Sequence, residues 1–130
     1  MQLNGLELWR EQQQIGGKPL ETIQYTLSKW SIWTIKDKEL LNLLDGRKGG
    51  RTTIRILDEI LSGPHNKNQL SRKLKLDYNT ITYHVNLLHK HKYIMEVKQE
   101  TRYYYHPTEK IFNSLEDYKL IKDYIKNKYK

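Results

Sequence analysis

The 130-residue chain contains no cysteine, which excludes disulfide bonds, thiolate zinc sites and thiol-based sensing. It also lacks any run of about 18 apolar residues, so the sequence predicts no membrane-spanning helix. The first residues, Met1–Gly5, do not place a basic stretch before an apolar one, and we expect no secretory signal. From the length we expect one compact domain with appendages, and from the absences a soluble cytoplasmic protein.

Positive charge is what the sequence has in excess. Lys and Arg number 23 against 15 Asp and Glu, for a net charge of +8. Residues 47–106 hold 12 basic and 5 acidic side chains, whereas residues 1–65 are almost neutral. Such a concentrated field attracts polyanions, although lysine is also common on soluble surfaces. We therefore expect an anionic partner, with nucleic acid favoured.

Helical signals dominate residues 37–92. The predicted helices are 38–44, capped by Asp37 and ended by Gly46, then 52–62, then a short helix capped by Asn66 or Asn68, and a longer one running from a cap at Asp77 to about Lys92. Residues 20–35 are ambiguous: alternating apolar positions favour one or two strands, and a helix also fits the spacing.

A hairpin and a final helix are expected next. Tyr93–Lys98 and Arg102–His106 have the composition of two strands around a turn at 99–101, and Pro107 stops the second strand. Thr108 can cap a C-terminal helix, with a break near Ser114.

The order helix, short helix, tight turn, longer helix and hairpin is typical of a winged helix-turn-helix. The expected fold class is mainly α with a small β-hairpin wing. In the predicted second helix of the pair, Ile81, Val85 and Leu88 form the core stripe, and polar residues point away from it. These outward residues can contact base edges or phosphates: Tyr78, Asn79, Thr82, Tyr83 and Asn86.

Residues 70–94, LSRKLKLDYNTITYHVNLLHKHKYI, resemble the helix-turn-helix of the ArsR-like winged-helix transcriptional regulators. The similarity extends over 46–106 and is greatest to archaeal members, with GRKGGRTTIRILDEIL at 46–61. It implies a DNA-binding transcriptional regulator whose recognition helix is 77–92, with the same outward residues facing bases, and whose wing is 93–106. The metal-sensing role of the family is not implied, because the chain has no cysteine and its C-terminal helix no histidine.

Several basic side chains are candidates for phosphate contacts. Lys98 and Arg102 flank the predicted wing tip, and three more lie beside the helix-turn-helix turn: Arg72, Lys73 and Lys75. At the start of the 52–62 helix, Arg51 and Thr52 belong either to a phosphate-facing helix end or to a plain linker.

No catalytic constellation and no ligand spacing for a metal stands out, so we expect neither an enzyme nor a cofactor. His84 lies next to the core stripe and is expected to be a partly buried histidine. His89 and His91 are two residues apart, so they point to different helix faces and cannot share a metal ion.

The C-terminal helix has an apolar stripe that is the expected homodimer interface: Ile111, Leu115, Tyr118, Ile121, Ile125 and Tyr129. The alternative is that this helix folds back onto its own domain. The chain then divides into an N-terminal extension (1–45), the winged helix-turn-helix (46–107) and the C-terminal helix (108–130).

Two other functions compete with double-stranded DNA binding. One is a winged-helix interaction module that docks onto the transcription machinery through the N-terminal aromatic segment. The other is single-strand or RNA binding, which depends on the aromatics Trp30, Trp33, Tyr103, Tyr104 and Tyr105 being exposed.

Overall fold

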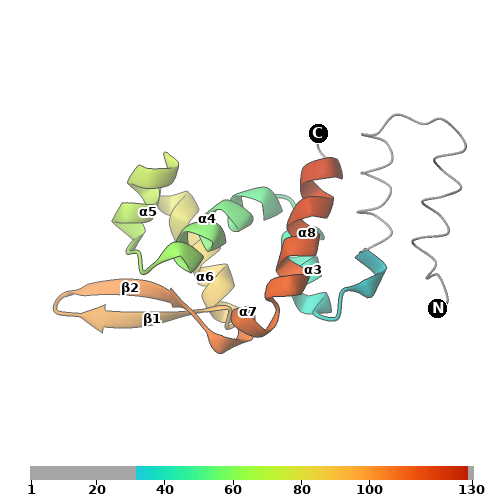
Figure 1. Cartoon of the computed structure of the whole chain (residues 1–130). Helices are drawn as coiled ribbons and strands as arrows, with labels where there is room; N and C mark the ends of the chain where they lie inside the picture. The colour runs from blue at the N-terminus through green and yellow to red at the C-terminus, as the bar shows by residue number, and fades with distance from the viewer. Residues whose placement is uncertain (1–31, 129–130) are drawn as a thin grey trace, which may run out of the picture.

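The computed structural model describes residues 32–128, which form helices and one antiparallel hairpin, as an α+β class requires. The elements are η1 (Ile32–Thr34), α3 (Lys38–Leu44), α4 (Gly50–Ser62), α5 (Lys67–Leu74), α6 (Tyr78–Lys90), β1 (Ile94–Gln99), β2 (Arg102–Pro107), α7 (Glu109–Asn113) and α8 (Leu115–Lys128). The hairpin projects from one end of the helices, and α3, α7 and α8 lie together at the other (Figure 1). The strands predicted across 20–35 fall mostly outside the described residues, and Ile32–Thr34 is a 3-10 turn instead.

The predicted caps set three of the helix starts. The Asp37 carboxylate accepts from the Leu40 N–H at 2.9 Å, and that of Asp77 accepts from the Thr80 N–H. Asn66 and Gln69 form a reciprocal capping box at the start of α5. Because a cap needs only local chemistry, these starts follow from the sequence.

Two glycines allow α3 and α4 to approach each other closely. Gly49 has a φ of 90°, a backbone conformation that residues other than glycine rarely adopt. A Cβ on Gly50 would lie 1.8 Å from the Leu44 carbonyl oxygen, so a side chain there would force the helices apart. Helix α4 therefore begins at Gly50, two residues before the predicted Thr52.

The hairpin pairs Ile94 with Pro107 and Gln99 with Arg102, within one residue of the predicted strands. A third short segment joins it, because His65 forms an isolated bridge with Tyr105. The Tyr105 N–H donates to the His65 carbonyl at 2.8 Å. This bridge anchors the loop between α4 and α5 to the base of the hairpin.

One continuous core runs through the described residues, and this overturns the reasoning for an exposed C-terminal stripe. Ile111, Tyr118, Ile121 and Ile125 are all buried within their own chain, and Leu115 packs against the same cluster. Tyr129 lies outside the described residues. The C-terminal helix is covered in part by α3, which the sequence analysis did not identify as its partner. The inward residues of α3 are Leu40, Leu43 and Leu44.

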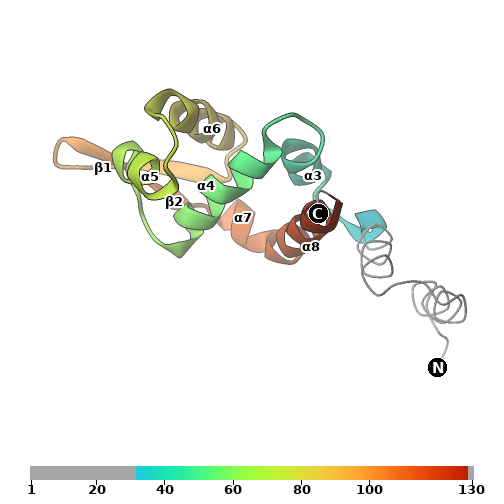
Figure 2. The ribbon, with the colours of Figure 1, turned by 90° about the horizontal axis from the view of Figure 1, so that it is seen from above.

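Polar ties accompany this packing. The Tyr118 hydroxyl donates to Asp58 of α4 at 2.6 Å, so this bond links α8 to α4. Helices α6 and α8 lie on opposite sides of α4 (Figure 2). The Asp37 carboxylate accepts from the hydroxyls of Tyr93 and Ser114. The fold-back of the C-terminal helix is thus fixed by hydrogen bonds as well as by apolar burial.

Candidate nucleic-acid interface

Helix α6 buries one face and exposes the other. Ile81, Val85 and Leu88 are fully buried, which fixes the rotation of the helix about its axis. On the opposite face Tyr83 is 59% exposed, and Asn79 and Asn86 are exposed as well; Tyr78, the first residue of the helix, is 50% exposed. Four of the five predicted base-facing residues therefore lie on an accessible surface.

Thr82 is the exception among these five residues. Its side chain is only partly exposed, and its hydroxyl oxygen is buried with no hydrogen-bond partner in the described part of the chain. A buried oxygen cannot reach a base edge, so the expected polar contact from Thr82 is not available in this conformation.

The turn before α6 is held by backbone and side-chain contacts. Lys75 adopts a left-handed conformation with a φ of 56°, and the Leu76 N–H donates to the Ser71 carbonyl at 3.1 Å. The Thr80 N–H, bonded to the Asp77 carboxylate, lowers the pKa of that carboxyl. Arg55 of α4 donates to the Leu74 carbonyl at 2.8 Å. These bonds hold the turn between α5 and α6 in place.

His84 is a buried histidine, as its position next to the core stripe predicts. It is 6% exposed, and its Nδ1 lies 2.8 Å from the Thr53 hydroxyl of α4. Burial lowers the pKa of His84, and the Arg47 charge lowers it further. The contact between His84 and Thr53 thus joins α6 to the first turn of α4.

Each exposed tyrosine around α6 and the hairpin has a cation beside its ring. Arg47 lies 5.7 Å from the ring centroid of Tyr83, and its guanidinium also donates to that hydroxyl at 3.4 Å. The other pairs, both at 5.8 Å, are Lys67 with Tyr78 and Lys98 with Tyr103. Arg47 and Lys67 were missed by the sequence analysis, because their partners are distant in the chain.

A cleft of about 480 Å³ separates the hairpin from the first turns of α5 and α6. It is lined by Asn66, Lys67, Asn68, Tyr78, Glu96, Arg102, Tyr103 and Tyr105. The single carboxylate, that of Glu96, accepts from the buried Tyr105 hydroxyl at 2.9 Å. Lys67 and Arg102 both line this cleft, and its one lining acid already accepts a hydrogen bond, so the cleft suits an anion.

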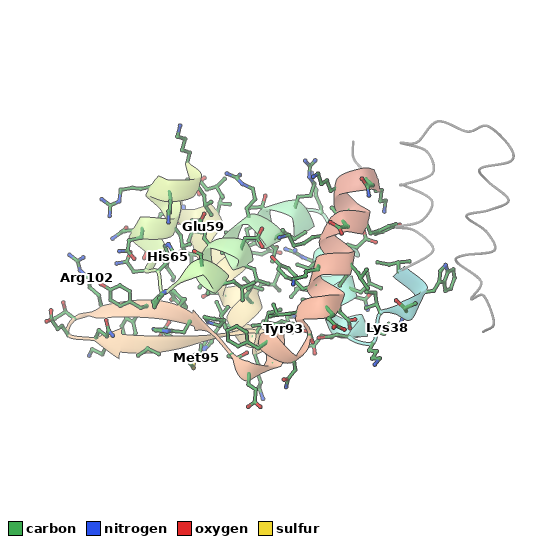
Figure 3. The ribbon with its side chains drawn as sticks, viewed as in Figure 1. Lys38, Glu59, His65, Tyr93, Met95 and Arg102 are labelled. Carbon is green, nitrogen blue, oxygen red and sulfur yellow. The ribbon has the colours of Figure 1, made fainter. Side chains whose placement is uncertain are left out.

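The predicted phosphate contacts do not all gather at this face. Lys98 and Arg102 are exposed on the hairpin, where Figure 3 places Arg102 on the strand nearer α5. Arg72 and Lys75 are exposed on and just after α5, and Arg51 and Thr52 lie in the first turn of α4. Lys73 instead forms an ion pair with Glu59 at 3.2 Å, beside His65, which partly neutralises its charge.

Comparisons with protein-family models, with curated proteins and with solved structures find no match to this chain. Residues 32–128 contain no group of three His, Asp or Glu side chains that could hold a metal ion. None of the helices formed by those residues is long and apolar enough to cross a bilayer. Assignment of a function therefore depends on the side chains and their arrangement.

Proposed function

We propose that this chain is a sequence-specific regulator of transcription that binds double-stranded DNA through a winged helix-turn-helix. In this proposal α4, α5 and α6 are the three helices, α6 enters the major groove, and the β1–β2 hairpin is the wing. The isolated bridge between His65 and Tyr105 supports it, because it ties the hairpin to the segment between α4 and α5, as a wing is tied to its helices.

The outward face of α6 carries the proposal. It presents two exposed asparagine side chains, which can bond an adenine edge bidentately, and the exposed Tyr83 lies at helical spacing from both. Asn79 and Asn86 lie about two helical turns apart, within the reach of one major-groove segment. The flanking cations Arg47, Lys67, Lys98 and Arg102 are placed where a duplex seated on α6 brings its phosphates.

Selection of bound duplexes from a random pool tests this function. We expect enrichment of a defined sequence of roughly one half-site, with affinity that falls steeply as salt is raised. Equal recovery of all sequences would contradict sequence-specific regulation.

Homodimerisation remains a prediction, but four of the six residues assigned to it, Ile111, Tyr118, Ile121 and Ile125, are buried in the monomer. We therefore expect a dimer to use another surface. Light scattering of the full chain measures the mass, and a two-fold operator with half-sites about 10 base pairs apart in the selected pool would accompany a dimer.

A second candidate function is supported by one observation at the other end of the molecule. Trp33 is 79% exposed, and a large exposed aromatic is a common anchor for a protein partner. This favours docking onto the transcription machinery through the N-terminal aromatic segment. Such a module would bind duplexes weakly and without sequence preference, so the selection experiment distinguishes it from the first proposal.

A further inference from the structure

A second basic surface lies between α4 and α8. Two adjoining hollows of about 490 and 440 Å³ follow the first half of α4 and the last turns of α8. They share Arg51, Arg55 and Ile125 in their linings, so they form one continuous depression, which we name the α4–α8 groove.

Cations line both walls of this groove. Arg51 and Arg55 are four residues apart on α4, and Lys122 and Lys126 are four apart on α8, so each helix presents one pair. Its full set of charged residues is Arg47, Lys48, Arg51, Arg55, Lys122, Lys126, Asp45 and Asp123. Six cations against two carboxylates make the groove strongly positive.

Part of this charge has no compensation nearby. Asp45 is paired with Lys128 at 3.4 Å, and Lys122 with Asp58 at 3.0 Å. Lys48 and Lys126 are exposed and form no ion pair within residues 32–128. The positive charge of these two lysines is therefore available to attract an anionic ligand.

The groove begins at the edge of the proposed DNA-binding face. Arg47 lines the groove and also donates to the Tyr83 hydroxyl on the outward face of α6. Arg55 lines it and bonds the Leu74 carbonyl beside the α5–α6 turn. Arg47 is therefore the cation that links the outward face of α6 to the groove.

We propose that the α4–α8 groove holds the phosphate backbone of the duplex that flanks the segment contacted by α6. This inference rests on the proposed DNA-binding function and extends it by a longer footprint and a bend of the DNA toward α8. The added phosphate contacts offset the cost of bending the duplex.

The chemistry of the lining favours phosphate over an acidic protein. Arginine side chains match phosphate oxygens with two parallel hydrogen bonds. The apolar lining residues, Leu44, Ile54 and Ile125, are buried or half-buried and offer no exposed anchor of the kind that stabilises protein interfaces. A backbone of repeated charges is the ligand that fits such a groove.

Binding to two duplexes tests the proposal. Both carry the selected sequence: the short one has about 12 base pairs and the long one about 30, so only the long one extends beyond α6. The test variant is the double substitution Lys48→Glu and Lys126→Glu. Its matched control is Lys38→Glu with Lys119→Glu, two exposed lysines outside the groove that also form no ion pair in the described residues. Circular dichroism verifies that both variants are folded.

We expect the two variants to bind the short duplex equally. On the long duplex, the groove variant should lose about tenfold more affinity than the control, and its salt slope should fall by about two, one for each lost phosphate contact. Two results would overturn the proposed phosphate binding in the groove without affecting DNA binding by α6. One is an equal loss of affinity by both variants on the long duplex, and the other is wild-type protein that binds the long duplex no more tightly than the short one. No wild-type binding to either duplex would refute the DNA-binding function itself, and the groove with it.

Discussion

Tyrosine has different roles in two regions of the molecule. One is the outward face around α6, and the other is the packed contact between α3, α4 and α8, which we call the seam. On the outward face, Tyr78, Tyr83 and Tyr103 are about half exposed and lie beside cations. In the seam, Tyr93 and Tyr118 also have a lysine beside their rings, but they are buried and donate to the carboxylates of Asp37 and Asp58.

This difference separates stability from binding. A buried tyrosine that donates to a carboxylate fixes the packing of two elements, and its loss leaves an acceptor without a partner. An exposed tyrosine beside a cation contributes little to folding, and it presents a ring and a hydroxyl to a ligand. Substitutions in the seam should therefore change the free energy of unfolding, and those on the outward face should change binding.

The largest expected effect in the seam is that of Asp37→Ala. This carboxylate caps α3 and accepts from the hydroxyls of Tyr93 and Ser114, so its removal orphans several donors at once. We expect a loss of about 3 kcal/mol in the free energy of unfolding, measured by urea titration. Asp123→Ala, at an exposed position of α8, is the control and should change little, and equal effects would contradict this role for Asp37.

Next in size is a matched pair of hydroxyl deletions. Tyr118→Phe removes the hydrogen bond to Asp58 and should lower the free energy of unfolding by about 1–2 kcal/mol. Tyr103→Phe on the hairpin should change stability by less than about 0.5 kcal/mol. Thermal or urea unfolding measures both variants, and similar losses would remove the contrast between the two regions.

The buried tyrosines also make stability depend on alkaline pH. Burial and the hydrogen-bonded Asp58 carboxylate raise the pKa of Tyr118, and the pKa values of Tyr93 and Tyr105 are raised in the same way by burial and their own carboxylate partners. The unfolded chain therefore releases these protons first, above about pH 10, and stability present below that pH is lost as the pH rises. Urea midpoints between pH 9 and 11 should fall less steeply for Tyr118→Phe, and parallel curves would argue against this linkage.

A smaller effect is expected at the hairpin. Lys98→Ala or Arg102→Ala should weaken binding to every duplex and reduce the salt slope by about one for each lost phosphate contact. Glu100→Ala, in the turn between the strands, removes a carboxylate instead and should not lower the slope. Salt titrations of binding by fluorescence anisotropy measure these slopes. Unchanged slopes in both the Lys98 and the Arg102 variants would mean that the hairpin does not contact the DNA.

The local features were predictable from the sequence, and the distant pairings were not. Asp37 and Asp77 were identified as caps, and Asn66 as one of two candidates, because a cap bonds an N–H within three residues. Arg47 and Tyr83 are 36 residues apart, and nothing in either segment indicates the other.

Which side chains are buried was also hard to predict, because burial depends on elements that are distant in the sequence. The α8 stripe was expected to need a second copy, because the leucines of α3 were not recognised as the surface that covers it. Lys73 and Thr82 were assigned from helical position alone. That position does not reveal Glu59 beside the lysine or the burial of the threonine hydroxyl.

The most direct test of the DNA-binding face is the ratio of affinities for the selected duplex and for a random duplex, measured for wild type, Asn79→Ala and Asn86→Ala. Both asparagines are exposed on α6 and can bond base edges. We predict that each substitution costs on the order of 1–3 kcal/mol on the selected duplex and almost nothing on random DNA, so the ratio collapses. Equal losses on both duplexes, or an unchanged ratio, would contradict base recognition by α6.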